Sequence, residues 1–243
     1  MKTLLLISVC CFQLSAFAQG FFQPRIGGTN LVGWWTFNEG TGTTAIDNSG
    51  KAHNGTLVNS PVWTNGVIGS GINFGSNYVG VVYDIPRNST TFSFWLKTTK
   101  TDQGIMTYSS TSYLYAGFTD RSFIITTNGF VLAYVYSGTV ATSFLTSTQS
   151  VVDGVWHHVG LTFTTTNKNL YVDGIKQATS TNGIQTTTGS MLYLTIGWAS
   201  ANGANTPTSP YFSGALDDLR IFNKVNSDSE ITQLYNSGHG TQQ

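Results

Sequence analysis

Residues 159–175 read VGLTFTTTNKNLYVDGI and contain two short runs of strand-forming residues joined by turns. The first run covers residues 159–163, and the second, residues 169–172, leads directly into Asp173-Gly174. This dipeptide suits a type I′ hairpin turn, because both central residues of that turn need positive φ angles. The stretch therefore predicts consecutive antiparallel strands.

Similar strand signals recur at roughly ten-residue spacing between Leu31 and Phe222, each bounded by Gly, Asn, Asp or Ser. The composition agrees with this pattern, since 13% of the residues are aromatic, only 9% are charged and 27 are glycines. Residues also alternate along single runs: Phe92, Phe94 and Leu96, whose face is expected to enter the core, alternate with Ser93, Trp95 and Lys97, whose face is expected to form a mixed polar and aromatic surface. A second run, residues 131–136, alternates in the same way. Two apolar faces of this kind predict an all-β fold of two stacked antiparallel sheets.

One helix is predicted near the end of the chain. Ser227 can cap its start, and Glu230 stands three residues later, where it completes a capping box. Ile231, Leu234 and Tyr235 follow at spacings that place them on one helical face.

The first residues of the chain resemble an export signal. Lys2 precedes a short apolar run, and Ala16-Phe17-Ala18 offers small residues at the cleavage position. Cleavage there leaves Gln19 as the mature N-terminus and predicts a secreted, periplasmic or cell-surface protein. The apolar run is too short to span a bilayer, so no transmembrane segment is expected.

These features divide the chain into a signal peptide (1–18), a lead-in segment (19–25), one folded domain (26–238) and a short tail (239–243). The length suits a single all-β domain. Both cysteines lie inside the predicted signal, so the exported chain is expected to contain no disulfide and no cysteine metal site. Eleven basic residues balance eleven acidic ones, and this even charge argues against a nucleic-acid partner.

A series of short motifs runs in order along the chain. They are WWTFNEG (34–40), DNSG (47–50), HNGTL (53–57), GSGINF (69–74), GVWHHV (154–159), LYVDG (170–174) and FSGALDDLRIF (212–222). The ordered set resembles the LamG-like jelly-roll domains of the concanavalin A-like lectin/glucanase superfamily. The resemblance implies a jelly-roll sandwich in which the first and last strands pair, with Trp35 near Leu219. Residues 104–150 match no motif of the family, so ligand preference is expected to reside there.

Calcium is the metal that this chain could best bind, because calcium takes carboxylate and carbonyl oxygen ligands. In members of the superfamily that carry a structural calcium, the ion often joins the opening segment to an acidic residue of the last strand. The corresponding residues here are Asp47 or Glu39 at the start and Asp217 at the end. An alternative stays open, in which Asp47 only forms an Asx turn into residues 48–50.

Catalytic sites are not indicated. The histidines of Trp156-His157-His158 would point to opposite faces of a strand and could not share one ion. Glycoside hydrolysis needs two carboxyl groups flanking one bond, yet Asp217 and Asp218 are adjacent and would also point apart. The sequence therefore predicts a protein that is not an enzyme.

Sugar binding without catalysis needs exposed aromatic faces together with a few hydroxyl or amide groups. The aromatic residues that lie beside loops rich in Ser, Asn and Gly are Trp198, Tyr113, Tyr115 and Tyr211, which we select as ligand-binding candidates. The function predicted is a secreted binding module for an extracellular or cell-surface glycan or a glycoprotein. An adhesion or matrix protein that binds a protein partner is the alternative, and a glycan-cleaving enzyme is the least favoured.

Overall fold

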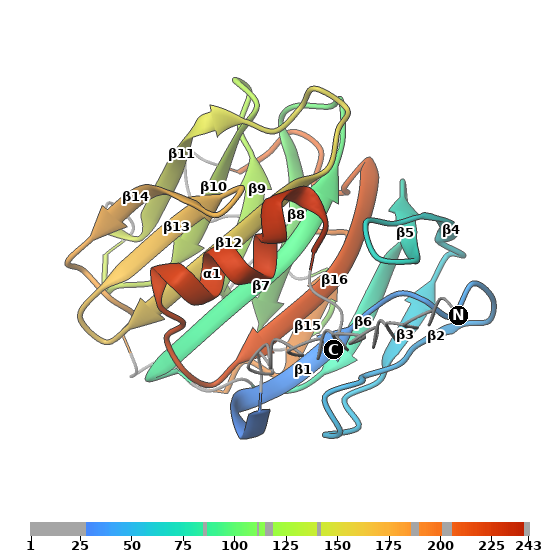
Figure 1. The fold of residues 1–243 in the computed structure, drawn as a ribbon, viewed down its shortest axis with the longest axis horizontal. Coiled ribbons are helices and arrows are strands. Elements are labelled where there is room, and N and C mark those ends of the chain that lie inside the picture. Colours follow the sequence, from blue (N-terminus) through green and yellow to red (C-terminus); the bar gives the residue numbers. More distant parts are fainter. Residues whose placement is uncertain are drawn as a thin grey trace, which may run out of the picture.

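The computed structural model describes residues 28–84, 87–110, 112–114, 119–139, 142–185, 190–200 and 206–240. Within these residues the chain forms two antiparallel sheets of eight strands each, stacked as a sandwich (Figure 1). The predicted all-β fold is therefore confirmed. The predicted signal peptide and lead-in segment lie outside the described residues.

The first sheet, sheet A, carries the strand pairing that closes the fold. In spatial order its strands are β14 (Ile175–Ser180), β13 (Lys168–Val172), β12 (His157–Thr164), β7 (Ser89–Lys97), β16 (Gly214–Phe222), β5 (Ser70–Phe74) and β4 (Val62–Asn65), while β1 (Leu31–Trp35) also pairs with β16. Trp35 lies opposite Leu219 in the β1–β16 pair. The expected pairing of the first and last strands is confirmed.

The second sheet, sheet B, lies behind sheet A in Figure 1. In spatial order its strands are β11 (Phe144–Ser150), β10 (Phe130–Val135), β9 (Thr119–Ile125), β8 (Gln103–Ser109), β15 (Tyr193–Ile196), β6 (Tyr78–Val82), β3 (Gly55–Val58) and β2 (Thr44–Ala45). Strand β15 is late in the sequence but lies between β8 and β6. Long connections therefore bring distant segments side by side, as jelly rolls require.

The core lies between the inner faces of the two sheets. Phe92, Phe94 and Leu96 of β7 are completely buried, and the Phe94 ring meets Phe123 of sheet B edge-on at 5.1 Å between centroids. Each such side chain contributes about 1.5–3 kcal/mol through burial. The apolar half of the alternation in β7 therefore faces the core as predicted.

The turn between β13 and β14 has the predicted form. Asp173 and Gly174 have φ angles of 52° and 75°, so both central residues are left-handed. A type I′ turn has this geometry, and its twist matches that of the flanking strands.

Helix α1 (Asp228–Tyr235) lies across the outer face of sheet A, over β12 and β7 in Figure 1. Ser227 and Glu230 form the predicted capping box. Ile231 and Leu234 are buried in a small apolar cluster on this face that also contains Tyr171. Among the described helices, none is long and apolar enough to cross a membrane.

This helix and the turn after it also cover residues that the sequence had suggested would form a mixed polar and aromatic surface. Ser93 and Trp95 of β7 are only 2% and 1% exposed, and the Tyr235 ring stacks on the Trp95 indole at 5.7 Å. Gly240, within the predicted tail, is buried as well. Of Ser93, Trp95 and Lys97, only Lys97 remains exposed.

Candidate functional site

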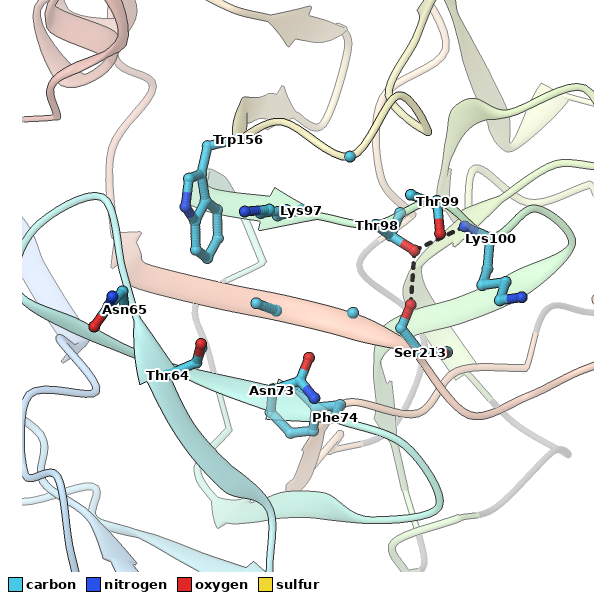
Figure 2. Close-up of a pocket in the computed structure, with 13 residues that line it drawn as sticks. Thr64, Asn65, Asn73, Phe74, Lys97, Thr98, Thr99, Lys100, Trp156 and Ser213 are labelled. Atoms are coloured by element: carbon cyan, nitrogen blue, oxygen red, sulfur yellow. Dashed lines mark hydrogen bonds between the residues drawn. The ribbon is translucent and has the colours of Figure 1, made fainter.

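A pocket of about 320 Å³ opens on the outer face of sheet A, in the part where Lys97 is exposed (Figure 2). Strands β4, β5, β16 and β7 provide the floor, and the loop before β12 provides one wall. The side chains that define its chemistry are Thr64, Asn65, Asn73, Lys97, Trp156 and Ala215.

The hollow in the floor comes from one short side chain. Ala215 of β16 pairs with Asn73 of β5 on one side and with Lys97 of β7 on the other. Residues directly opposite one another in a sheet project from the same face. The alanine methyl group therefore lies between two longer polar side chains, both of which are exposed.

The wall is the indole ring of Trp156, which hangs over the floor strands in Figure 2. Its loop is tied down on both sides of a turn. The Asp153 carboxylate accepts a hydrogen bond from the Val155 N–H at 3.0 Å, and the Gly154 N–H donates to the carbonyl oxygen of Thr98 at 3.0 Å. Gly154 has a φ of +83°, which glycine adopts without strain. The backbone that carries the ring is thus tied to the end of β7.

The two histidines that follow Trp156 point to opposite sides of β12. The Nδ1 atom of His157 lies 2.8 Å from Asp173, and its Nε2 atom lies 3.1 Å from Asp153. The hydrogen bond with Asp173 is the main cause that raises the pKa of His157. His158 lies on the outer face, 2.8 Å from the Ser93 hydroxyl, and burial lowers its pKa to about 3. His157 therefore links Asp153 in the Trp156 loop to Asp173 in the β13–β14 turn. His158 links β12 to β7 through its contact with Ser93.

Thr98 holds the far end of the pocket together. Its hydroxyl donates to the Ser213 carbonyl oxygen at 2.6 Å and accepts from the Lys100 N–H and the Gln103 amide, both at 3.0 Å. Gln103 also accepts a hydrogen bond from the Ser213 N–H at 2.7 Å. Because Thr98 and Gln103 are buried, this network keeps the pocket formed without a ligand.

The polar side chains of the floor are available to a ligand. Within the described part of the chain, the side chains of Thr64, Asn65, Asn73 and Lys97 make no hydrogen bond or ion pair with protein groups. A half-buried indole beside hydroxyl and amide groups can pack against the apolar face of a sugar ring while hydrogen bonds fix its orientation.

None of the four predicted ligand-binding aromatics lines this pocket. Trp198 is only 5% exposed, and it forms an isolated antiparallel bridge with Tyr211, which is half-buried. Tyr115 lies outside the described residues. The pocket also uses no residue from 104–150, where ligand preference had been expected.

Tyr113 belongs to a group of tyrosines on sheet B. Its ring contacts Tyr78 and Tyr193 at centroid distances of 5.9 Å and 5.1 Å. A Cβ atom added at Gly80 would lie 2.8 Å from this ring, so the glycine permits the close approach. Burial is the main cause that raises the pKa of Tyr113. A ligand-binding role for these tyrosines stays a prediction.

The carboxylates of Asp47 and Glu39, proposed for calcium, accept hydrogen bonds from backbone N–H groups. Asp47 accepts hydrogen bonds from the N–H groups of Ser49 and His53, both at 2.9 Å, and the first of these forms an Asx turn. Glu39 accepts from the Ile46 N–H at 2.7 Å. Both residues therefore shape the opening segment.

Asp217 is buried on β16 and meets different partners. Its Oδ2 atom accepts from the N–H groups of Val67 and Ile68 at 2.7 Å and 3.0 Å. Burial is the first cause that raises its pKa to about 7. Asp218 points elsewhere and accepts from the indole N–H of Trp34 at 2.7 Å. Among the described residues, no three His, Cys, Asp or Glu side chains are grouped to hold a metal, and calcium binding stays a prediction.

Sequence reasoning did not select Trp156 as a ligand-binding residue, although a signal was present. His158 pairs with Trp95 in the sheet, so strand alternation places Trp156 on the same face as Lys97. In this stretch only the adjacent histidines, His157 and His158, were considered, as metal-binding or catalytic residues.

Several solved structures have the same fold. Domain 4 of AbnA, an extracellular GH43 arabinanase from Geobacillus stearothermophilus in complex with arabinotriose, has a TM-score of 0.64 and 16% identity, covering 85% of this chain and 98% of that one. The binding domain of botulinum neurotoxin DC in complex with SialylT has a TM-score of 0.62 and 16% identity, covering 87% of this chain and 52% of that one. Trypanosoma rangeli sialidase in complex with DANA has a TM-score of 0.61 and 16% identity, covering 87% and 34%.

These likenesses establish the fold, and the chain spans about half of the toxin structure and a third of the sialidase structure. A search of the curated proteins finds no match. The Laminin_G_3 family, described as the concanavalin A-like lectin/glucanases superfamily, matches residues 70–232. Because this match extends over more than half of the chain, the protein belongs to the concanavalin A-like lectin/glucanases superfamily.

Proposed function

We propose that this protein is a non-catalytic carbohydrate-binding module whose glycan ligand lies in the Trp156 pocket. The observation that carries the proposal is the half-buried indole above a floor whose amide and hydroxyl groups make no hydrogen bond to other described residues. An aromatic face and a few polar groups suffice to hold one or two sugar rings. The arabinanase domain and the toxin domain were each solved with a saccharide, which supports this class of ligand.

The pocket is also preorganised. The hydrogen bond from Gly154 to Thr98 ties the loop of Trp156 to the end of β7. His157 contacts Asp153 of the same loop and Asp173 of the next turn, which further restrains the loop. A site that needs no ordering on binding retains more of its contact energy as affinity. Weak contacts to a few sugar hydroxyls can therefore produce measurable binding.

The placement of the acidic residues supports binding rather than cleavage. No side chain that lines the pocket is Asp or Glu, whereas glycoside hydrolysis uses two carboxyl groups on opposite sides of the bond. Asp217 is fully buried, and Asp153 is bonded to His157. Purified protein is expected to release no reducing sugar from β-glucans, xylans or alginates, and turnover would contradict the proposal.

The extracellular setting is part of the proposal. Residues 1–18 have the charge and apolar pattern of an export signal. A module exported in this way would meet glycans of a cell surface or matrix.

The test is a glycan array followed by calorimetry with the best saccharide. Trp156→Ala is expected to weaken binding by about 2 kcal/mol or more, as for other buried aromatic anchors. Tyr113→Ala is the matched control, because it removes a half-buried aromatic from the tyrosine group on the other sheet. Its affinity is expected to equal that of the wild type.

Two results would overturn the proposal. Loss of binding in Tyr113→Ala with full binding in Trp156→Ala would move the site to sheet B. Binding to a glycoprotein that survives periodate oxidation of its sugars would support recognition of protein instead.

A further inference from the structure

The Trp156 pocket contains a positive charge, that of Lys97, which no carboxylate of the described residues neutralises. Lys97 is the last residue of β7, and its side chain lines the same pocket as Trp156, next to whose ring it is drawn in Figure 2. It is exposed, and within the described part of the chain no carboxylate pairs with its ammonium group. A cation held beside an aromatic wall marks a place for an anionic group.

Three acidic residues next to the pocket-lining segments are engaged elsewhere. Asp102, two residues after Lys100, accepts a hydrogen bond from the Thr208 N–H at 3.2 Å. Asp153 is bonded to the Val155 N–H and to His157. Asp217, two residues beyond Ala215, is buried and accepts hydrogen bonds from two backbone amides. The wall and floor therefore offer an ammonium group and hydrogen-bond donors without a competing carboxylate.

The protein as a whole exerts no strong attraction on anions. Its eleven basic residues equal its eleven acidic ones, so attraction must arise from local placement. A single ammonium group can donate up to three hydrogen bonds, and bonds from charged donors are roughly twice as strong as neutral ones.

From this geometry we infer that the pocket prefers saccharides that carry an anionic substituent, with Lys97 binding that group while Trp156 packs against the sugar ring. This inference rests on the proposed glycan-binding function and names its ligand class. A uronate or sialate carboxylate and a sulfate ester share the required chemistry. The amide group of Asn73, which projects from the same face as Lys97, can donate to the same ligand.

Lys100 provides a matched control for the charge. It also lines the pocket and is exposed, but its ammonium group points away from Trp156 in Figure 2. Lys97→Gln and Lys100→Gln therefore each remove one positive charge from the lining of the same pocket. Only the first removes the group that faces the bound sugar.

The experiment uses an array that pairs sialylated, uronate-containing and sulfated oligosaccharides with their carboxyl-reduced or desulfated counterparts. Calorimetry on the best pair then compares the wild type with the variants. The wild type is expected to bind the anionic member roughly tenfold more tightly, which equals about 1.4 kcal/mol. Lys97→Gln is expected to lose this preference and Lys100→Gln to keep it. Added salt should reduce the preference, because it screens the attraction between charges.

The outcomes separate the inference from the function on which it rests. If the wild type binds neutral and anionic members equally and Trp156→Ala binds neither, the glycan site stands and the anion preference is wrong. If Lys97→Gln and Lys100→Gln lose the preference for the anionic saccharide equally, the inference is also wrong, because the preference would then depend only on the overall charge. If the wild type binds no glycan on the array, the proposed function itself fails. The carboxylate and sulfate pairs show which anion the pocket accepts.

Discussion

Replacing Asp217 with Asn removes a fully buried carboxylate from β16 with little change in shape. Asn retains an oxygen that can accept the hydrogen bonds of Val67 and Ile68, and its amide nitrogen takes the place of Oδ1, which has no hydrogen-bond partner among the described residues. Burial raises the pKa of Asp217 from 3.8 to about 7. The folded protein therefore holds a proton that the unfolded chain has already released.

The sign and size of the effect follow from this difference. Between the two pKa values the folded state binds more protons than the unfolded state, so stability falls as the pH rises. One pKa unit corresponds to about 1.4 kcal/mol. The wild type is thus expected to lose about 2.5 kcal/mol of unfolding free energy between about pH 5 and pH 7.5 because of Asp217.

Urea unfolding of both proteins over this pH range, in EDTA, measures the effect. The raised pKa of His157 also stabilises the fold at low pH, and that contribution is lost as the pH rises through its folded value. Since His157 is present in both proteins, the difference between the two curves isolates Asp217. Parallel curves for the wild type and Asp217→Asn would refute the reasoning.

Melting temperatures of the same two proteins, measured in calcium and in EDTA, test the prediction of a calcium site. An ion bound only by the folded state stabilises it by about 2.7 kcal/mol at a hundred times its dissociation constant. If Asp217 and Asp47 hold calcium, EDTA lowers the melting temperature of the wild type, and Asp217→Asn loses most of that response. If the wild type melts at one temperature in calcium and in EDTA, Asp47 has only its role in the turn.

Two further predictions concern Lys168 and the N-terminus. Lys168 is fully buried, its ammonium group donates to the carbonyl oxygens of Val135 and Thr142, and burial lowers its pKa to about 8. Because the unfolded chain then binds more protons, stability is expected to rise by about 1.5 kcal/mol between about pH 8 and 9.5, and Lys168→Gln should lack this rise in urea unfolding. N-terminal sequencing of exported protein should begin at Gln19, and an intact Met1 in a membrane fraction would contradict export.

The parts of the fold that sequence predicted correctly depend on local signals or on ordered motifs. The turn at Asp173-Gly174 follows from two residues that tolerate positive φ. The start of α1 follows from Ser227 and Glu230, which lie three residues apart. The pairing of β1 with β16 came from the order of family motifs, because no local signal links strands so far apart in sequence.

The site was harder to predict because exposure depends on packing between distant elements. Strand alternation placed Trp95 and Lys97 on one outer face, and the structure agrees. Alternation cannot show that α1 and Tyr235 would cover Trp95 and leave Lys97 open. The burial of Trp198 was equally hard to predict: it is only 5% exposed, although small residues flank it in the sequence.

The location of the pocket follows from how α1 divides the outer face of sheet A. Apolar residues such as Ile231 fix the helix over one part of the sheet, and the face beyond it keeps its polar row of Asn73, Ala215 and Lys97. A flat sheet holds a small ligand poorly, because a ligand needs a concave surface to bury its own area. The short side chain of Ala215 and the overhanging ring of Trp156 provide that concavity, and both belong to rigidly held backbone. Changes in the floor side chains could therefore alter ligand preference while the sandwich and its helix stay the same.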